Sequence, residues 1–251
     1  MKQLVVGWQD EKRWYPIGKV ERDDKYFSFA YTKGAQVAAD ECHFQPLLSF
    51  PDFKRIYKSA EMFPWLRHRL LSNKRPEFKR YLQWLQIDSN QYNEFSILAK
   101  SGGRRATDAF ELFAIPALST SGWSQIEFFL RGIQSISTAS RQRIAQLQVN
   151  EPLFLMQDYA ADECVLRTQD QFLLGFCPKY LSSLLVSVIR HSPEEVIAKV
   201  QKVNQAPTPM EFRLLCHVDL RLPNGDNPFN QEVYKSLVSH VTHQRTPDKQ
   251  A

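Results

Sequence analysis

Basic side chains that could bind phosphate are concentrated between Lys54 and Arg80. Nine lysines and arginines lie in that stretch against two glutamates, and the four arginines of most interest are Arg67, Arg69, Arg75 and Arg80. Such a cluster neutralises phosphates and releases their counterions, which is the sequence-independent part of nucleic-acid affinity. A solvated face of a helix explains the same pattern. The chain's net charge of +5 resides entirely in residues 1–118, because the remainder carries equal numbers of acids and bases.

A second candidate phosphate site is the polar run Gly102-Gly103-Arg104-Arg105. Consecutive glycine amides can wrap an anion while Arg104 and Arg105 add charge-assisted hydrogen bonds. A turn carrying two solvated arginines is the competing interpretation, and we favour it slightly.

No catalytic or metal-binding constellation has a recognisable spacing. The six histidines are scattered, with only His240 and His243 on one helical face, and the four cysteines form no Cys-x-x-Cys pair. Zinc sites and redox dithiols require such local spacing, so the cysteines are predicted to be reduced core residues. We therefore expect no enzyme, no metal and no cofactor, although an active site assembled from distant residues, such as a nuclease, stays open.

The elements that position these residues follow from the hydrophobic pattern. Residues 4–8, 14–20 and 26–31 alternate as strands, whereas apolar spacings of three and four from Pro51 to Leu85 predict helices. A strand is predicted at 109–115, and a polar boundary follows near Ser119–Gly122. Beyond it we expect one helix at Lys179–Arg190 among short strands at 127–133, 144–149, 152–157, 163–168, 172–177, 196–202 and 212–219.

These elements predict an α+β protein of two domains. Residues 1–118 would form a β-meander with helices, and residues 119–251 a small OB-like β-barrel with one helix and a C-terminal tail. The N-terminus has neither a signal-peptide core nor a membrane span, so a cytoplasmic location without membrane contact is expected.

Three segments of the second half resemble the HIRAN family of nucleic-acid-binding barrels. Phe172–Leu185 is similar to its strand-to-helix turn of a hydrophobic residue, Gly, Tyr, a hydrophobic residue, Pro and Arg. Glu151–Arg167 is similar to its strand, Asn-Pro-Tyr-Asp loop and second strand, and Phe128–Gly132 to its entry strand. The resemblance implies an OB-like barrel, which in helicase-like members captures the 3′ end of single-stranded DNA.

The resemblance also implies a binding surface. Arg131 matches the entry-strand arginine and would contact a phosphate, while Tyr159 matches the loop tyrosine and would stack on a base. Ala160 stands where the family has the aspartate that meets the 3′-hydroxyl, so only a shifted alignment lets Asp158 or Asp162 replace it. Lys179 and Tyr180 would add a phosphate contact and a second stacking face at the helix start. An ordinary surface arginine and tyrosine, and a helix cap, are the alternatives.

The first half resembles the N-terminal subdomain of HipA-type kinases, through Trp14–Val20, Phe27–Ala35, Phe44–Pro51 and Met62–Arg69. The kinase core itself is not legible, so the resemblance implies a regulatory or docking domain. Together these observations favour a non-catalytic protein that binds single-stranded DNA or DNA 3′ ends, as an accessory in defence or repair and with a protein partner. The alternative is a protein-interaction or antitoxin-like subunit without DNA affinity.

Overall fold

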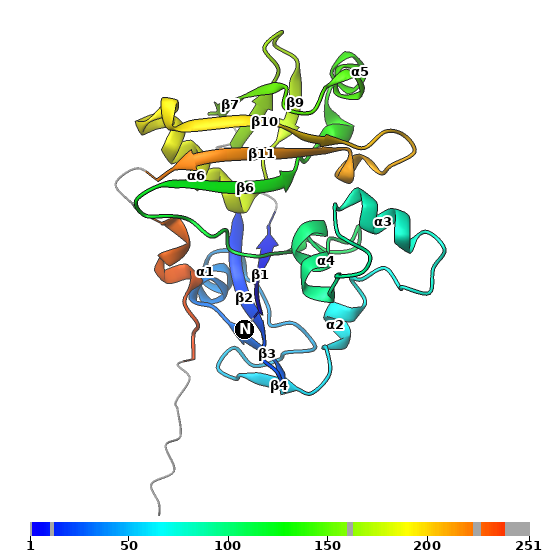
Figure 1. The fold of residues 1–251 in the computed structure, drawn as a ribbon. Coiled ribbons are helices and arrows are strands. Elements are labelled where there is room, and N and C mark those ends of the chain that lie inside the picture. Colours follow the sequence, from blue (N-terminus) through cyan, green and yellow to red (C-terminus); the bar gives the residue numbers. More distant parts are fainter. Residues whose placement is uncertain (1, 11–12, 160–162, 223–226, 239–251) are drawn as a thin grey trace, which may run out of the picture.

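The computed structural model describes residues 2–10, 13–159, 163–222 and 227–238. It is a mixed α+β structure built on two curled antiparallel sheets (Figure 1). The strands of the second sheet cross above the ends of β1 and β2 in that view. Within the described residues, no helix has the length and apolarity needed to cross a membrane.

The first sheet confirms the three N-terminal strands that alternation predicts. Its order is β4 (Tyr57–Ser59), β3 (Phe27–Tyr31), β2 (Trp14–Arg22), β1 (Lys2–Gln9) and β5 (Phe110–Phe113). Helix α1 (Lys33–Cys42) packs on β2 through small residues. A Cβ on Gly34 would lie 2.3 Å from the Pro16 carbonyl oxygen, so only glycine permits this approach.

The helical prediction for residues 51–85 is correct in part. Helices α2 (Pro64–Arg67) and α3 (Phe78–Trp84) lie there, and α4 (Glu94–Ser101) follows. Residues 53–59 are instead a turn and strand β4, because Tyr57 pairs with Phe29 across the sheet and its ring packs 5.1 Å from that of Phe50. Cross-strand aromatic packing outweighs the local spacing at this point.

The second sheet has the order β6 (Trp123–Phe129), β11 (Leu214–Arg221), β10 (Val196–Val203), β7 (Pro152–Asp158), β8 (Glu163–Arg167) and β9 (Leu173–Phe176). Its two edges meet just beyond β6. The Arg131 amide donates to the Phe176 carbonyl at 2.8 Å, and the Phe176 amide donates to that of Arg131 at 2.9 Å. Gly175 permits this contact, since a Cβ there would lie 2.4 Å from the Arg131 carbonyl oxygen.

Helix α6 (Lys179–His191) covers β7 and β8 and confirms the predicted helix. Its residues Leu181, Leu184, Leu185 and Val188 recur at helical spacing and are buried. Three of the four cysteines, Cys164, Cys177 and Cys216, are free and buried in the same core, as predicted, while Cys42 is partly exposed.

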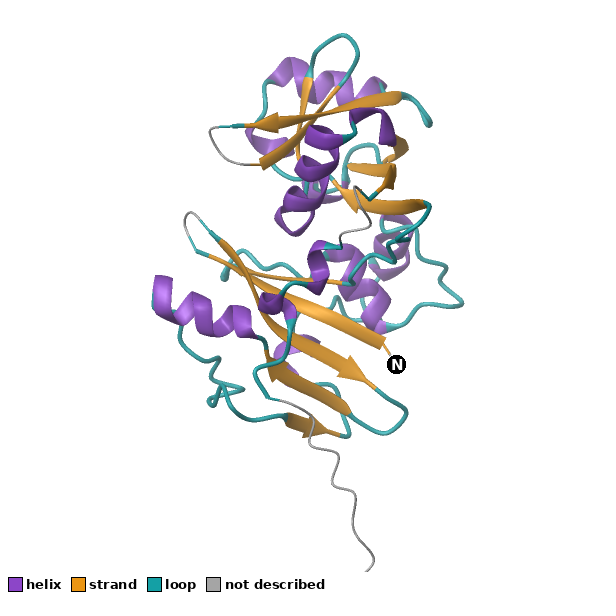
Figure 2. Cartoon of the chain, turned by 90° about the vertical axis from the view of Figure 1, so that its left-hand side faces the viewer, coloured by secondary structure: helices purple, strands orange, loops and turns teal. Residues whose placement is uncertain are grey.

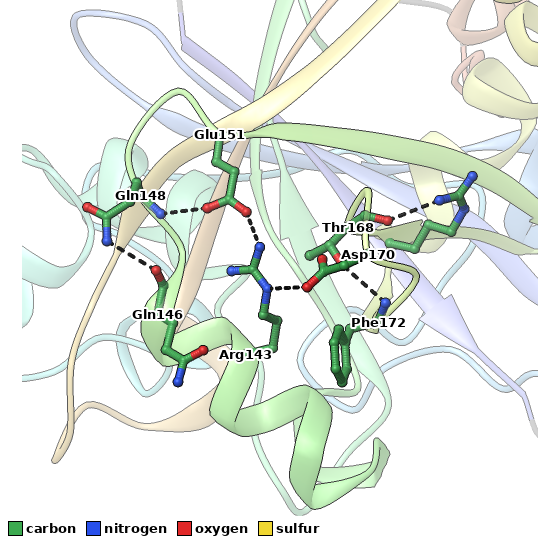
Figure 3. A network of polar contacts seen from close by, with 8 residues as sticks. Arg143, Gln146, Gln148, Glu151, Thr168, Asp170 and Phe172 are labelled. Carbon is green, nitrogen blue, oxygen red and sulfur yellow. Dashed lines mark hydrogen bonds and ion pairs between the residues drawn. The ribbon is translucent and has the colours of Figure 1, made fainter.

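The strand predicted at residues 144–149 is wrong. Its first residues belong to helix α5 (Thr138–Gln146), whose N-cap Ser137 accepts a hydrogen bond from the Ser140 amide. Ile144 and Leu147 are buried, and their spacing of three is helical rather than strand-like. Arg143 links this helix to Glu151 and Asp170 through ion pairs (Figure 3).

The core of the second sheet extends into the first, although most buried residues of the first sheet form a cluster of their own. Val5 and Phe113 of the first sheet belong to the same buried cluster as the inner residues of the second. The C-terminal segment Pro228–Leu237 returns to the first sheet, where the Lys33 amide donates to the Lys235 carbonyl and the Leu237 amide to that of Tyr31. The predicted division at residue 118 therefore separates the sheets, which Figure 2 shows one above the other, but not the packing.

Candidate nucleic-acid interface

A pocket of about 680 Å³ lies between the two sheets, and we call it the inter-sheet pocket. Both sheets contribute to its wall, because β1, β2 and β5 supply one side and β8, β9 and α6 the other. Three bases, Arg104, Arg131 and Lys179, line it together with four carboxylates and several aromatic rings. The other lining side chains that matter here are Trp8, Trp14, Phe110, Phe176, Asp10, Asp108, Glu111 and Glu163.

Arg131 is the most unusual residue of the pocket. Its side chain is only 15% exposed, and burial lowers the pKa of its guanidinium. Among the described residues, its buried Nε atom has no hydrogen-bond partner, and its one ion pair, with Glu111, is long at 4.0 Å. Glu111 is already engaged, since it accepts a hydrogen bond of 2.9 Å from Trp14 Nε1. An incompletely bonded buried cation is costly, although the Nε atoms of Arg69 and Arg213 are also buried without a partner among the described residues.

The backbone explains why Arg131 lies there. Its amide and carbonyl close the second sheet against Phe176, so the side chain projects from the seam between β6 and β9. Gly102 leaves room for it, because a Cβ on that glycine would lie 3.0 Å from the guanidinium. The sequence prediction thus selected a residue that the fold holds at the junction of both sheets.

Lys179 and Tyr180 begin α6 beside this pocket. Lys179 forms an ion pair of 2.8 Å with Glu163, so its charge is partly neutralised. The ring of Tyr180 stacks on Phe113 with centroids 3.9 Å apart, and burial raises the pKa of its phenol. Phe113 occupies one face of this ring, and the half-buried tyrosine serves the packing between sheets. The stack on Phe113 leaves at most the other face of the ring for a base.

Tyr159 is free to stack, because its side chain is 82% exposed. It follows β7 directly, and the last pair of that hairpin joins half-buried Asp158 to Glu163, which lines the pocket. Asp162 lies outside the described residues. The hairpin thus brings Tyr159 close to the pocket without placing it in the wall.

The glycine run at residues 102–105 does not form the phosphate cradle. The Gly102 amide caps α4 by donating to Leu98 at 2.9 Å, and the Gly103 amide donates to Ser101 Oγ at 3.1 Å. Both amides are used internally, which fits the turn interpretation. Arg104 and Arg105 remain exposed, and only Arg104 reaches the inter-sheet pocket.

The basic cluster divides into exposed and buried members. Arg69 is wrong as a phosphate ligand, because its side chain is 1% exposed and forms two hydrogen bonds with Asp108, at 3.1 and 2.6 Å. Arg67 and Arg75 are exposed and pair with Glu61 and Glu77, each at 3.2 Å. Arg80 is exposed and lies over the ring of Trp84 at 5.5 Å.

The sequence prediction missed the residues that the first sheet contributes. Trp8 and Trp14 flank the β1–β2 turn, and Glu111 lies in β5 opposite Gly7. A pair of tryptophans beside a charged turn was the available signal. Their convergence with Arg131 depends on how the two sheets pack, which no local pattern records.

No family model and no curated protein matches this chain. A solved structure, the crystal structure of a protein from Lactobacillus plantarum, aligns with 39% of this chain and 97% of its own, at 12% identity and a TM-score of 0.30. A likeness of that extent supports no conclusion about fold family or function.

Proposed function

We propose that this chain is a non-catalytic binding protein for single-stranded DNA, which it holds in the inter-sheet pocket, between the first sheet and a HIRAN-like, OB-like barrel. One observation carries the proposal: Arg131 lines the pocket with a side chain only 15% exposed, and its one ion pair among the described residues, with Glu111, is long at 4.0 Å. A guanidinium offers several donors in a planar fork that matches a phosphate. A bound phosphate would supply the hydrogen bonds that the fold leaves unmade.

The surroundings of Arg131 fit a nucleic-acid strand with one phosphate bound inside the pocket and the next phosphate bound outside it. Arg104 is exposed at the pocket and can take a second phosphate, while Trp8, Trp14 and Phe176 offer ring surface. Tyr159 adds an exposed ring on the adjacent hairpin, and base stacking on such rings contributes about 1–3 kcal/mol per base. These features recognise a strand whose bases are unpaired.

The decisive experiment replaces Arg131 by methionine, which keeps the length of the side chain and removes its charge. Hydrogen bonds to a charged group are worth about 1.5–3 kcal/mol, so we expect the affinity for a labelled dT10 oligonucleotide to fall at least about tenfold. Fluorescence anisotropy at a fixed salt concentration measures it. Arg221→Met is the matched control, since Arg221 is exposed at the end of β11 and pairs with Glu195. Equal affinities of both variants and the parent protein would refute the proposal.

The same titration with a 3′-blocked oligonucleotide distinguishes two binding modes. Ala160 replaces the aspartate that the resemblance assigns to 3′-hydroxyl capture. Weaker binding of the blocked oligonucleotide identifies capture of the end. Unchanged binding identifies contact along the strand, which the mixed charge of the pocket also permits.

The exposed basic side chains of Arg75, just before α3, and Arg80, within α3, are expected to add salt-dependent affinity. Arg75→Gln combined with Arg80→Gln should reduce the slope of log affinity against log salt by about 0.7 for each phosphate that the variant no longer neutralises. Anisotropy titrations at several salt concentrations measure the slope. Arg69 is not used for this purpose, because its replacement would disturb the fold instead. An unchanged slope would place the oligonucleotide away from α3.

The carboxylates of the pocket favour the alternative, a protein-interaction subunit. Glu111 and Glu163 line the same wall as Arg131 and repel a polyanion. Two results together would establish that alternative. The parent protein would bind no oligonucleotide, and a stoichiometric protein partner would bind the parent protein but not Arg131→Met.

A further inference from the structure

A second cavity lies on the other side of β5, between α4 and β6, and we call it the α4 cleft. Its volume is about 490 Å³, within the range of about 300–1,000 Å³ that is usual for small-molecule sites. Its wall is mostly apolar and includes Leu4, Phe95, Leu112, Ile115, Pro116 and Phe128. Shape and lining are those of a site for a compact apolar molecule.

Arg131 also lines this cleft, so the same guanidinium lies between the cleft and the inter-sheet pocket. Lys2 and Lys100 are two further cations of the wall, and Glu127 is its one carboxylate. Lys100 lies 3.7 Å from Glu127 and is 35% exposed, and Lys2 is exposed, so Arg131, at 15% exposed, is the most buried cation of the wall. The buried charge of this mostly apolar wall is therefore positive and belongs to Arg131.

We propose that the α4 cleft binds a small organic monoanion, with an apolar body against Phe95, Leu112 and Phe128 and one carboxylate on Arg131. A single carboxylate matches the guanidinium fork and its single charge. A doubly charged phosphate fits less well, because Glu111 and Glu127 are close to the same position. This site would exist whether or not the chain binds DNA.

One guanidinium cannot give its full set of hydrogen bonds to two anions at once. A carboxylate in the cleft therefore competes with a phosphate in the inter-sheet pocket, and by linkage each ligand weakens the other by the same factor. This consequence alone rests on the proposed function. It makes the cleft a site of regulation for nucleic-acid binding.

Isothermal titration with 2-naphthoate and its uncharged counterpart 2-naphthamide tests the site directly. We expect 2-naphthoate to bind at least about tenfold more tightly, because only its carboxylate engages Arg131. Arg131→Met should abolish that difference while leaving the weak binding of 2-naphthamide. Equal affinity of the parent protein for the two compounds, or no binding of either, would overturn the proposal.

A second pair of variants tests the location. Ala114 is exposed and lines the cleft, so Ala114→Trp should fill its mouth without disturbing the core and abolish binding of both compounds. Ala117 is also exposed but lies outside the lining, so Ala117→Trp is the matched control and should bind normally. Retention of binding in Ala114→Trp would place the compounds elsewhere and overturn the assignment.

Competition then separates the two proposals. With both proposals correct, 2-naphthoate displaces labelled dT10 from the parent protein but not from Ala114→Trp. Binding of 2-naphthoate to a protein that fails to bind dT10 supports the cleft and refutes only the proposed function. Simultaneous binding of both without mutual effect refutes the shared role of Arg131, and with it the regulation.

Discussion

Two buried arginines of this chain have opposite surroundings. Arg69 forms two hydrogen bonds with Asp108 and a third with the Gly103 carbonyl, and its guanidinium lies 4.1 Å from the ring centroid of Trp65. Within the described residues, Arg131 has one ion pair, a long one with Glu111. The Nε atoms of both arginines are buried without a hydrogen-bond partner, so the difference lies in the terminal nitrogens, which in Arg69 are bonded to Asp108 and Gly103. Burial alone therefore does not identify a binding arginine.

Replacement of Arg69 tests the structural half of this contrast. Arg69→Met should lower the free energy of unfolding by about 3–5 kcal/mol, because it leaves the Asp108 carboxylate without its cation and the Gly103 carbonyl without its side-chain donor. Urea denaturation followed by circular dichroism measures the change. Arg67→Met, two residues away, should alter stability by less than about 1 kcal/mol, since its pair with Glu61 is exposed. A similar loss of stability in both variants would contradict the structural role of Arg69.

Individual site residues could be predicted from the sequence only where the residue type and a recognisable motif identified them. Arg131, Lys179 and Arg104 all line the inter-sheet pocket, although the sequence placed them in separate motifs. Arg69 and Arg67 are indistinguishable in the sequence, because both lie in one basic run. Their opposite burial follows from packing against Trp65 and Asp108, which tertiary structure alone decides.

At the scale of elements, α5 depends on one side chain at its C-terminal turn. Arg143 donates to Asp170 at 2.9 Å and pairs with Glu151, which also accepts the Gln148 amide (Figure 3). These contacts join the helix to the start of β7 and to the β8–β9 turn. They fix the helix against the second sheet.

This network predicts a sensitivity to acid. The hydrogen bond from Arg143 lowers the pKa of the Asp170 carboxyl below its ordinary value of 3.8. A lowered pKa in the folded state contributes stability above pH 3.8 and loses it as the pH falls further. Arg143→Met should therefore be less stable than the parent protein at pH 7, with a smaller difference at pH 3. Urea midpoints at both values measure this, and Asp170→Asn should behave alike. A difference independent of pH would exclude the ion pair as its source.

Elements with regular alternation could be predicted, and those shaped by distant contacts could not. Helix α6 buries one helical face and was predicted to within one residue, whereas the strand predicted at 127–133 overlaps β6 only at Glu127–Phe129, although most of β6 alternates exposed and buried residues. Strand β4 has only three residues, and it forms because the ring of Tyr57 packs against those of Phe29 and Phe50. Such a strand has no signature of its own. The prediction of a helix there followed the local spacing and missed the partner.

At the scale of the whole molecule, the C-terminal segment ties the two sheets together. Phe229 and Tyr234 are buried with Phe113 in the core that both sheets share, and Phe229 lies 6.3 Å from Phe113 between ring centroids. Ser236 forms a bridge to Thr32, which belongs to the first half of the chain. Neither half is complete without this segment.

Phe229→Ala should therefore destabilise the whole molecule rather than one half. A cavity at this position is expected to cost about 3–5 kcal/mol, in a single transition seen by probes in both sheets. Tryptophan fluorescence reports on both sheets, since Trp8 and Trp14 lie in the first and Trp123 in the second, and near-ultraviolet circular dichroism reports on the whole chain. Val149→Ala is the control, since Val149 is exposed. Two separate transitions in the parent protein would show that the halves fold independently.

Lys235 and Leu237 pair with residues at the end of β3, and this pairing sets the order in which parts of the chain can fold during synthesis. The amide of Lys33 and the carbonyl of Tyr31 obtain their partners more than 200 residues later in the chain. A growing chain can form β1, β2 and β3 early, but it cannot complete that region until residues 235–237 have left the ribosome. The first sheet should therefore remain accessible to proteases and chaperones until the second sheet has been synthesised.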